Sequence, residues 1–537
     1  MRFRPQLRSL AAALALALGA CADDPTGPGL APGGALRDEE TAAVAAFNGN
    51  IRIGVLPTSN AVEIGAGGDW TITDKATGAV LMTGTGGSAT VTLASGSVTN
   101  TYYRLQVMCG SDAAVAALKA AAEAQGVVTY TEPVPTANCT RLYLGQFASN
   151  ASFAVRNAFR NQMLAAGLAQ ADSFWRLVTT VTGVTTYIVT RGGETASSPN
   201  PVVLTAAGGI VTIAGQPYRG VAEVRRNSQG SLAGINELPI EEYLYGVVPR
   251  ELPPVPYGEL EALKAQAVAA RTYALSGLGK RGADGYDLLA TTSDQVYGGY
   301  AAEHPVSTQA VDETRAVVAT HEGRLIQALF SSTSGGYTAN NEDVFNSDPV
   351  PYLRGVRDHQ HGNAEHVLDS LRHAPNPQSL RGKKNGDFEA DWSRYHRWTF
   401  SWTMDEISDV ISLYAGQGVG RVLAINVLER SASGRVKRIE YVTEAGTFYD
   451  TKDHVRTSLK FIGAGGVKSS LLSTLFLIEP VVDRRTGETV GYEAFGGGWG
   501  HGVGLSQTGA VGMAEKGALY DEILRHYYQG IELTTWY

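Results

Sequence analysis

A glycine-rich segment near the C-terminus, Gly496–Leu533, constrains the fold more than any other part of the chain. It reads GGGWGHGVGLSQTGAVGMAEKGALYDEILRHYYQGIEL. Glycine is favoured where the backbone takes a positive φ or passes close to another group. With Trp499 and His501, the exposed backbone donors suit the wall of a polar-ligand site; a tight loop around a buried histidine is the alternative. Two short helices are predicted to follow, ended by Gly517 and Gly530.

Length and composition favour a β-rich protein of several domains. The 537 residues are 44% hydrophobic, enough for a sizeable core, and this length predicts about three domains. Glycine is abundant, at 63 residues, whereas charged residues make up only 18% of the chain. This balance is more typical of a loop-rich extracytoplasmic protein than of a helical cytosolic one.

The N-terminus has the order of a secretory signal peptide. Three arginines, Arg2, Arg4 and Arg8, precede an apolar run that is too short to span a bilayer. The sequence Leu-Gly-Ala-Cys that follows resembles a bacterial lipobox, which implies that Cys21 is lipidated; an ordinary signal peptide with a chance cysteine is the alternative. We expect a lipoprotein leader over 1–21, contact with the membrane through the lipid anchor only, and an extracytoplasmic location in the periplasm or cell envelope.

The mature chain is acidic and opens with a linker. Loss of the three leader arginines changes the net charge from −8 to −11. An acidic chain is not steered toward nucleic acid, so we expect no nucleic-acid partner. Residues 22–48 include DDPTGPGLAPGG, a composition that predicts a flexible tether.

Three further regions together indicate an α+β protein. Residues 49–100 are predicted to form a small β unit, since short apolar runs alternate with turn signals such as DKATG. Residues 101–182 have a different pattern, which predicts the order strand, helix, strand, strand, helix, strand. This order predicts a ferredoxin-like βαββαβ module with its helices on one face of an antiparallel sheet. Residues 187–537 are expected to form a mixed, β-rich catalytic domain with packed helices, and the module is either placed before this domain or inserted within it.

Two cysteines remain once Cys21 is assigned to the lipid. They are Cys109 and Cys139, and an even number in an oxidising compartment favours a bridge. In the βαββαβ topology the strands that carry them are antiparallel neighbours, which brings both cysteines to the same edge. We therefore predict a disulfide between them.

The two halves of this module carry a weak repeated pattern. They read YRLQV at Tyr103–Val107 and LYLGQF at Leu142–Phe147. These segments resemble the repeated motif of the sporulation-related repeat (SPOR) domain. The resemblance implies binding to peptidoglycan glycan strands, and a generic βαββαβ module without a ligand is the alternative.

A glutamate in apolar sequence surroundings is the first candidate for chemistry. Glu251 stands among apolar and proline residues in VVPRELP, directly before a segment whose leucines and alanines share one helical face. Desolvation penalises an ionised carboxylate, so such a group keeps its proton to higher pH and can serve as a general acid. Without further context, a solvated loop residue is the commoner outcome for a glutamate.

Several blocks in register carry a specific family resemblance. They are VVPRELP with the helix EALKAQAVAARTYAL, then TSDQVYGG at Thr292–Gly299, SSTSGGYT at Ser331–Thr338, and GGGWGHGVGLSQTGA. Together they resemble the family of sporulation stage II protein D and the amidase enhancers of cell-wall hydrolases, over Val202–Leu533.

The resemblance implies a lytic transglycosylase that acts on peptidoglycan without a cofactor. The glutamate of the family's VVPxE motif, here Glu251, is then the catalytic acid. It protonates the oxygen between N-acetylmuramic acid and N-acetylglucosamine, and its carboxylate then takes a proton from the muramyl 6-hydroxyl, which closes onto C1. Because no water attacks, the paired carboxylates of hydrolysing glycosidases are not needed.

The matching blocks also supply candidate substrate-binding residues. They are Arg271, Tyr273, Gln295, Tyr297, Ser334, Gly335, Gly336, Trp499, His501 and Gln507. For Arg271 a packing ion pair, and for Tyr273 a core tyrosine, are the alternatives; Trp499 either stacks on a pyranose ring or packs. Phe330 departs from the family, where some relatives carry a polar residue, and this change is expected to alter substrate preference.

The chain offers a second, non-enzymatic interpretation and one histidine cluster. Amidase enhancers stimulate another wall hydrolase, so a glycan-binding activator with a cell-wall amidase as partner is the rival of the enzyme. His359, His361 and His366 have a spacing that zinc accepts, but metal-bound relatives use cysteines that this stretch lacks, so we expect no metal. Residues 355–401 are read as a long loop or insertion at the rim of the cleft.

Overall fold

The computed structural model describes most of the chain from residue 47 onward. The described residues are 47–94, 98–134, 139–170, 173–182, 185–255, 257–358, 364–373, 393 and 395–537. Cys21 and the predicted leader lie outside these residues, so lipidation stays a prediction. No helix within the described ranges is both long and apolar enough to cross a membrane.

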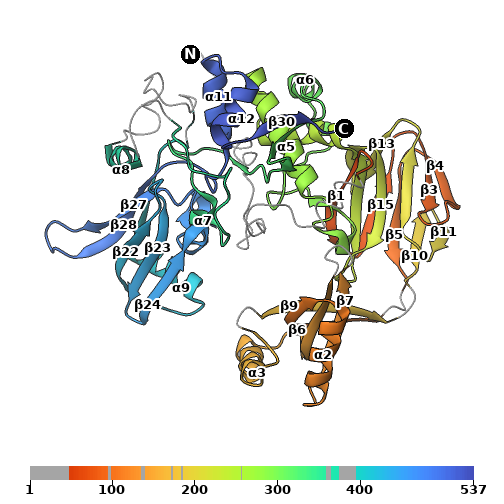
Figure 1. Ribbon diagram of the computed structural model, residues 1–537, viewed down its shortest axis with the longest axis horizontal. Helices are drawn as coiled ribbons and strands as arrows, with labels where there is room; N and C mark the ends of the chain where they lie inside the picture. The colour runs from red at the N-terminus through yellow and green to blue at the C-terminus, as the bar shows by residue number, and fades with distance from the viewer. Residues whose placement is uncertain are drawn as a thin grey trace, which may run out of the picture.

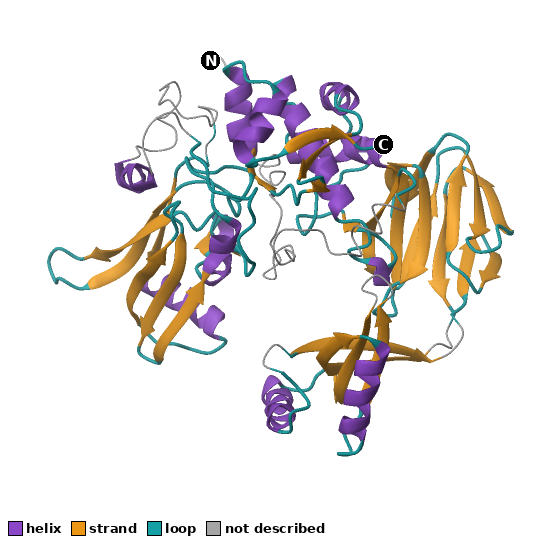
Figure 2. Ribbon diagram, in the orientation of Figure 1, coloured by secondary structure: helices purple, strands orange, loops and turns teal. Residues whose placement is uncertain are grey.

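Two sheets, antiparallel except where the short β17 joins β1, pack face to face (Figures 1 and 2, right). One sheet has the order β17 (Leu288–Leu289), β1 (Asn50–Ser59), β16 (Leu232–Pro239), β15 (Val221–Arg226), β12 (Val202–Ala206), β3 (Asp69–Asp74) and β4 (Val80–Thr85). The other has the order β11 (Glu194–Ser198), β10 (Tyr187–Arg191), β5 (Ser88–Leu93), β2 (Ala61–Gly65), β13 (Ile210–Ile213) and β14 (Gln216–Arg219). Fully buried side chains of both sheets, such as Ile72 and Val91, form one core.

The predicted boundary between a small β unit and a later domain is wrong. β1 pairs along its length with β16, from Asn50 opposite Pro239 to Ser59 opposite Leu232. β5 likewise pairs with β10, which lies beyond the module. Strands before and after residues 98–182 therefore share both sheets, and the module is inserted into this β-sandwich. The alternation of apolar residues shows which face of a strand is buried, but it does not identify the partner strand.

The inserted module has a four-stranded antiparallel sheet in the order β7, β8, β6, β9. Its elements follow the chain as β6 (Val98–Gly110), α2 (Asp112–Glu123), β7 (Thr129–Val134), β8 (Cys139–Ala148), α3 (Phe153–Ala165) and β9 (Phe174–Thr182). Ser111 and Ser152 cap the two helices with their hydroxyls. Leu105, Leu142 and Leu144 are fully buried in the core of the module.

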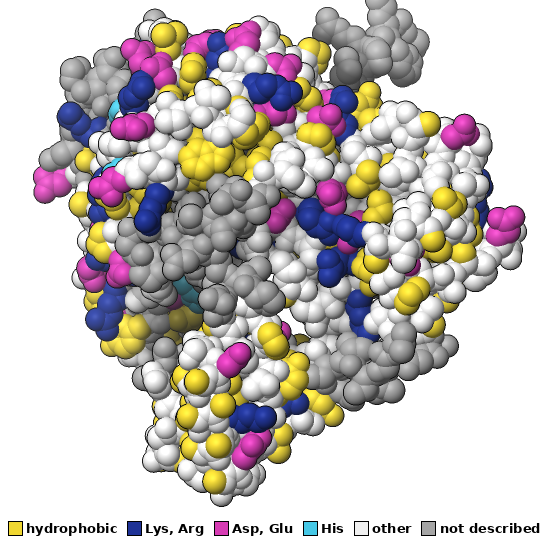
Figure 3. Space-filling view, turned by 45° about the vertical axis from the view of Figure 1, so that its right-hand side comes forward, with side chains coloured by type: hydrophobic (Ala, Val, Ile, Leu, Met, Phe, Trp, Pro, Cys, Tyr) yellow, Lys and Arg dark blue, Asp and Glu magenta, His cyan; other side chains and the backbone are white. Residues whose placement is uncertain are grey.

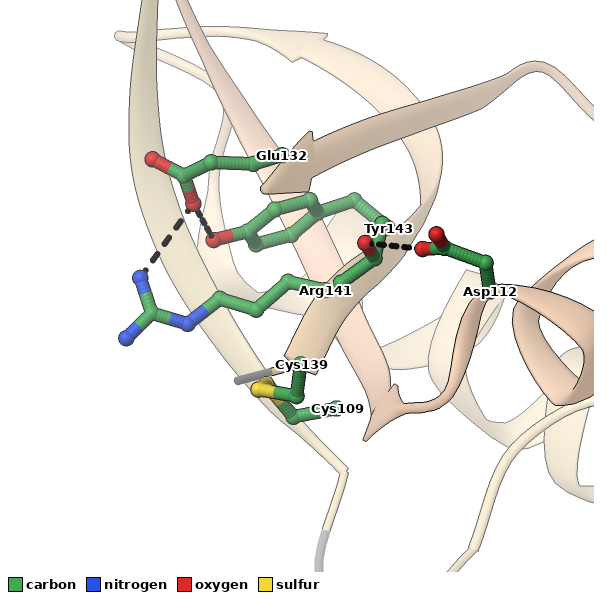
Figure 4. Close-up of a disulfide and its surroundings, with 7 residues drawn as sticks. Cys109, Asp112, Glu132, Cys139, Arg141 and Tyr143 are labelled. Atoms are coloured by element: carbon green, nitrogen blue, oxygen red, sulfur yellow. Dashed lines mark hydrogen bonds and ion pairs between the residues drawn. A yellow bond between two sulfur atoms is a disulfide. The ribbon is translucent and has the colours of Figure 1, made fainter. Parts of the chain in front are cut away.

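The predicted disulfide between Cys109 and Cys139 is confirmed (Figure 4). Cys109 lies opposite Arg141 in the β6–β8 register, so the two cysteines meet at one end of adjacent strands, with their Cα atoms 5.5 Å apart. Beside the bridge, the Glu132 carboxylate accepts hydrogen bonds from Tyr143 and Arg141 (Figure 4). These contacts tie β7 to β8 at the edge of the sheet.

Helices and short strands form a layer that follows the sandwich. They are α4 (Ile240–Glu251), α5 (Leu260–Ser276), η3 (Gly282–Asp284), η4 (Tyr300–Ala302), α6 (Pro305–Glu313), β18 (Val317–His321), β19 (Arg324–Leu325), β20 (Phe330–Ser331), α7 (Asn341–Val344), β29 (Leu505–Ser506), α11 (Gln507–Glu515), α12 (Tyr520–Tyr527) and β30 (Glu532–Thr535). α5 is nearly all buried and packs against α4, α6, α11 and α12. Alanine at six of its positions permits this close approach.

A C-terminal lobe with its own core interrupts this layer (Figure 1, left). It contains α8 (Ala364–His373), β21 (Trp398–Thr403), α9 (Met404–Ala415), β22 (Val422–Arg430), β23 (Val436–Thr443), β24 (Gly446–Thr451), η6 (Lys452–His454), α10 (Val455–Ser458), β25 (Phe461–Ile462), η7 (Ala464–Gly466), β26 (Lys468–Ser469), β27 (Phe476–Val482) and β28 (Thr489–Gly496). Its core packs Trp402, Ile407 and Tyr441 among other buried residues. The sequence did not predict this lobe as a separate unit.

Excision of the module tests the insertion. Leu93 pairs with Tyr187, and the Ala94 N–H donates to the Thr186 carbonyl over 2.9 Å, so a three-residue loop made of Asn, Gly and Thr185 can join β5 to β10. Replacing residues 95–184 by Asn-Gly is expected to leave a cooperatively unfolding protein whose melting temperature shifts by less than about 4 °C. Thermal unfolding followed by near-ultraviolet circular dichroism measures this.

The control replaces residues 208–220 by the same turn. It removes β13 and β14 and with them the fully buried Val211, so the sandwich is expected to unfold. An aggregated or molten chain after excision of 95–184 would show that the module is an integral part of the sandwich.

Candidate functional site

Glu251 is the last residue of α4 and is almost completely buried, with 2% of its surface exposed. Pro249 lies inside the helix, and Leu252, which follows Glu251, leaves helical geometry and so ends it. One carboxyl oxygen accepts a hydrogen bond from the Val296 N–H over 2.6 Å. The other lies 3.5 Å from the side-chain nitrogen of Gln507. Glu251 thus meets two of the glycine-containing blocks that the sequence singles out.

Burial raises the pKa of Glu251 to about 8. The Val296 N–H, the Gln507 amide and the positive charge of Arg250 each lower this pKa, but together they do not offset the loss of hydration. No second carboxyl group among the described residues contributes to the shift. At neutral pH the group therefore carries a proton that it can donate.

The loop Asp294–Tyr297 holds the Val296 N–H in place. The Gln295 side chain donates to the Ala270 carbonyl of α5 and accepts from the Tyr243 hydroxyl of α4, both over 3.1 Å. The buried Asp294 carboxylate accepts from Lys280, Arg281, Tyr273 and the Leu289 N–H. The two polar side chains that precede Val296 are thus fixed to α4, to α5 and to the segment after α5, and these contacts hold the Val296 N–H against Glu251.

Tyr297 docks the same loop onto α4. Its hydroxyl donates to Asn236 over 2.9 Å, and its ring lies 4.9 Å from the ring of Tyr243. A Cβ atom at Gly246 would approach this ring to 2.6 Å, so only glycine fits at that position of the helix. Burial raises the pKa of Tyr297 well above its usual value, which keeps the hydroxyl neutral.

The Ser-Gly-Gly turn and the Gly-Trp-Gly-His run interlock by backbone pairing. Thr333 and Trp499 exchange two hydrogen bonds, at 3.1 and 2.9 Å. A Cβ atom at Gly335 would approach the backbone of Gly497 to 2.8 Å, and Gly335 also takes a φ of 80°. The glycine there is therefore required for both conformation and space.

Ser334 and Gly336 complete this turn from within the protein. The buried Ser334 hydroxyl donates to Asp358 over 2.6 Å and accepts from the Gly336 N–H over 3.0 Å. Asp358 also accepts from the Tyr527 hydroxyl of α12 over 2.6 Å. The carboxylate of Asp358, which the sequence did not identify, thus anchors the turn to the helical layer.

His501 is enclosed by the protein, whereas Trp499 is partly exposed. His501 is buried, and burial, with the nearby Arg456 and Arg435, lowers its pKa to about 3, so the ring stays neutral. Its Nδ1 accepts from the Val503 N–H, and its ring lies 5.4 Å from Phe345. Trp499 remains half-buried, with its ring centre 4.4 Å from that of Tyr395. Its partial exposure leaves Trp499 able to meet a ligand.

Arg271 and Tyr273 do not contact Glu251 in the described structure. The guanidinium of Arg271 is completely buried and donates to both carboxylate oxygens of Glu241, over 2.9 and 2.6 Å. It also donates to the Val317 and Val311 carbonyls. Tyr273 donates to Asp294, so it acts on the loop beside Glu251 instead. The packing alternatives weighed for these two residues describe their contacts.

Phe330 begins β20, whose backbone pairs with β29 of the glycine-rich segment at Leu505. Phe330 is fully buried, and its ring lies 6.4 Å from that of Tyr273. Its expected effect on substrate preference is untested. His359 and His361 lie outside the described residues, and His366 belongs to α8. Within the described ranges, no three His, Cys, Asp or Glu side chains are grouped closely enough to hold a metal ion.

A cleft of about 600 Å³ lies between the inserted module and the segment that follows α5. Arg141 and Tyr143 line it on the module side, and Lys280 and Arg281 line it on the other. Figure 3 shows the hollow between the module, at the bottom of the view, and the body above it. Since Lys280 and Arg281 also hold Asp294, one wall of the cleft is joined directly to the loop that contacts Glu251.

Two family models match the chain. The model described as stage II sporulation protein (SpoIID) matches residues 228–321, which include Glu251, α5 and the Val296 loop. A domain of unknown function matches residues 339–504, which include the C-terminal lobe and the Gly-Trp-Gly-His run.

Named relatives align over about 300 residues. The amidase enhancer of Bacillus subtilis is 31% identical over 302 residues, 55% of this chain and 40% of that protein. An uncharacterised protein of Brachyspira hyodysenteriae is 32% identical over 300 residues, 56% of this chain and 67% of that protein. The stage II sporulation protein D of Bacillus amyloliquefaciens is 29% identical over 317 residues, 56% of this chain and 75% of that protein. The match therefore spans less than half the length of the amidase enhancer.

Removal of the Arg271 side chain tests its structural contacts. Burial raises the pKa of Glu241, but the hydrogen bonds and charge of Arg271 bring it below its usual value, so Glu241 is ionised. Arg271→Met leaves this buried charge uncompensated and is expected to lower the free energy of unfolding by about 3–5 kcal/mol. Urea unfolding measures it. Adding Glu241→Gln to Arg271→Met should recover much of the lost free energy. A double variant as unstable as Arg271→Met alone would contradict the pairing of Arg271 with the charge of Glu241.

The raised pKa of Glu251 predicts a pH-dependent stability. The folded protein keeps the proton up to about pH 8, whereas the unfolded chain releases it near 4.5. The stabilisation that Glu251 contributes is therefore complete below pH 4.5 and is lost as the pH rises to 8. Between pH 5 and 9, Glu251→Gln should gain about 3–5 kcal/mol of unfolding free energy relative to the wild type. Urea titrations of both proteins at pH 5 and pH 9 give their unfolding free energies. If Glu251→Gln differs from the wild type by the same amount at both pH values, Glu251 is an exposed carboxyl group with an ordinary pKa.

Proposed function

The chain belongs to the stage II sporulation protein D (SpoIID) family, and from this premise we propose that it is a lytic transglycosylase of peptidoglycan. In this proposal the enzyme cleaves the bond between N-acetylmuramic acid and N-acetylglucosamine, with Glu251 as its acid and base. The observation that carries the proposal is the buried carboxyl of Glu251, whose pKa is raised to about 8.

One carboxyl group suffices for the proposed reaction. The proton of Glu251 passes to the glycosidic oxygen as its bond to muramyl C1 breaks. The resulting carboxylate then takes the proton of the muramyl 6-hydroxyl as that oxygen bonds to C1, which yields a 1,6-anhydro end. The acid is regenerated without water, cofactor or a second carboxylate. The low polarity around Glu251 favours the neutral acid with which the cycle starts.

Substrate binding is proposed for the walls around Glu251. The half-buried Trp499 is suited to stacking on a pyranose ring. Gln507 presents its amide to the acid, while Gln295 and Tyr297 hold the opposite loop. The turn Ser334–Gly336 is joined to the Gln507 side, because the Ser334 N–H donates to the hydroxyl of Ser506. For His501, its neutral ring supports binding by hydrogen bonds over proton transfer.

We assign the module and the leader supporting roles in this proposal. The SPOR-like module is proposed to hold glycan strands, and the cleft beside Tyr143 and Lys280 is large enough for part of a polysaccharide. Lipidation of Cys21 is proposed to anchor the protein outside the cytoplasm, where peptidoglycan lies. Both assignments rest on sequence patterns.

A non-enzymatic activator is the second candidate function. It is favoured by the 31% identity to a protein named amidase enhancer. In that case the same walls bind glycan, and a cell-wall amidase is the partner.

Denuded glycan strands separate the two candidates. The purified chain without its leader is expected to release fragments with 1,6-anhydromuramyl ends, detected by mass spectrometry. Glu251→Gln should lower the rate by about 10²–10⁴-fold because the proton donor is lost. The control Glu259→Gln changes an exposed carboxyl eight residues away and should not alter the rate.

The enzyme proposal also requires a characteristic pH profile. The rate is expected to fall as the pH rises through about 8, where Glu251 loses its proton. If anhydro ends do not form, or persist in Glu251→Gln, the transglycosylase is ruled out. Stimulation of an added amidase by both the wild type and Glu251→Gln would then establish the activator.

A further inference from the structure

Two buried glutamine side chains form a chain of contacts that ends at Glu251. Gln266 lies in the middle of α5, and Gln507 is the first residue of α11. Gln266 is completely buried and Gln507 is 2% exposed. The Nε2 atom of Gln507 lies 3.5 Å from a carboxyl oxygen of Glu251 and 3.3 Å from Oε1 of Gln266. The Gln507 amide therefore bridges the candidate acid and the second amide.

The second amide has an unused donor. Nε2 of Gln266 is buried and has no hydrogen-bond partner among the described residues. Buried amide groups usually find partners, so an unsatisfied donor beside a functional group requires an explanation. Neither glutamine carries a charge, so this pair can influence Glu251 only through hydrogen bonds.

The pair has two self-consistent arrangements, related by a half-turn of both amides. In the arrangement observed, Gln507 presents its NH₂ group to Glu251 and to Gln266, which suits a carboxylate because a carboxylate only accepts. A protonated Glu251 needs an acceptor for its O–H. After the half-turn, Oε1 of Gln507 accepts from Glu251 and also from Nε2 of Gln266, so the unused donor is satisfied.

We propose that Gln266 is a positioning residue that orients Gln507, so that the Gln507 amide turns with the proton of Glu251 and supports this carboxyl group both as acid and as base. The inference rests on the proposed function, in which Glu251 donates a proton and then takes one back. It adds a role for a residue on α5 that does not contact Glu251 itself. No proton passes through either amide, and the proton balance of the reaction is unchanged.

The charged groups around Glu251 are one exposed arginine and side chains that are held in ion pairs. Arg250, on α4, is the charge that acts on Glu251, and it is exposed. On the loop, Asp294 is held by Lys280 and Arg281, and on α5, Arg271 is held by Glu241. Substitution of the uncharged Gln266 leaves these ion pairs intact, so its effect on Glu251 can be measured separately.

A double-mutant cycle tests whether Gln266 acts through Gln507. Gln266→Met removes the second amide at nearly constant volume and is expected to lower kcat about tenfold with KM changed less than twofold. Because Gln507 then supports the carboxylate less well, the alkaline limb of the rate profile should move to higher pH by about half a unit. In the Gln507→Met background, Gln266→Met should add less than a twofold effect, since Gln266 acts through Gln507.

A matched control and a second readout keep the test decisive. Thr272→Val removes another buried polar group of α5, one that binds the Val268 carbonyl and the Ala319 N–H, and should leave the pH profile unchanged. The second readout is the pH dependence of unfolding, whose midpoint reports the proton of Glu251 without catalysis. Gln266→Met should move this midpoint upward as well. If Gln266→Met does not fold, Gln266→Asn, which misplaces the amide, carries the same prediction.

The outcomes separate this inference from the proposed function. A wild type that forms no anhydro ends contradicts the transglycosylase, and the unfolding midpoint alone then decides the role of Gln266. If the wild type is active and Gln266→Met changes neither the pH profile nor the midpoint of unfolding, the proposed role of Gln266 is overturned. Independent, multiplicative effects of Gln266→Met and Gln507→Met on the rate would overturn it as well. A shift of the midpoint with a non-additive cycle supports it.

Discussion

The hydrogen bond from the Val296 N–H to Glu251 is the contact on which the candidate site depends. A carboxylate that accepts several strong backbone donors becomes a strong acid, whereas a fully dry one becomes a weak acid. Glu251 has one short backbone donor and one long amide contact, and burial dominates. The loop therefore has two tasks, since it supplies the donor and also keeps water away. Each residue that fixes the loop therefore helps to set the pKa of Glu251.

The interior of the helical layer contains many buried polar groups, and several are paired across elements. Arg271 holds Glu241, and Asp358 joins the Ser334 turn to Tyr527. Such pairs are costly to break, because removal of one member leaves the other buried without a partner. They account for the presence of arginine and glutamine on the buried helix α5. Several residues that resemble binding groups in the sequence thus fix the loops that surround the acid.

Local sequence patterns predicted local structure well. The expected helix after Glu251 is observed as Leu260–Ser276, and the bridge between Cys109 and Cys139 is present. Gln507 was selected from the glycine-rich block, and it is the candidate that contacts Glu251 besides the Val296 loop. In these cases, residues close in sequence or in a simple topology determine the outcome.

Long-range relationships could not be read from the same patterns. The pairing of β1 with β16 joins segments separated by the whole module, and strand alternation carries no information on such partners. The separate core of the C-terminal lobe, between Trp398 and Ala494, was not distinguished from the rest of the predicted catalytic domain. The roles of Gly246 and Gln266 were also missed, since a glycine under a tyrosine ring and a glutamine in a helix become informative only when their neighbours are known.

The pairing of β1 with β16 also has a consequence for biogenesis. Asn50 meets Pro239 only after nearly two hundred residues have been synthesised, so the sandwich closes late. The module between them completes its own sheet and disulfide from residues 98–182 alone. The inserted module can therefore fold first, and the sandwich whose strands flank it in the sequence can form afterwards.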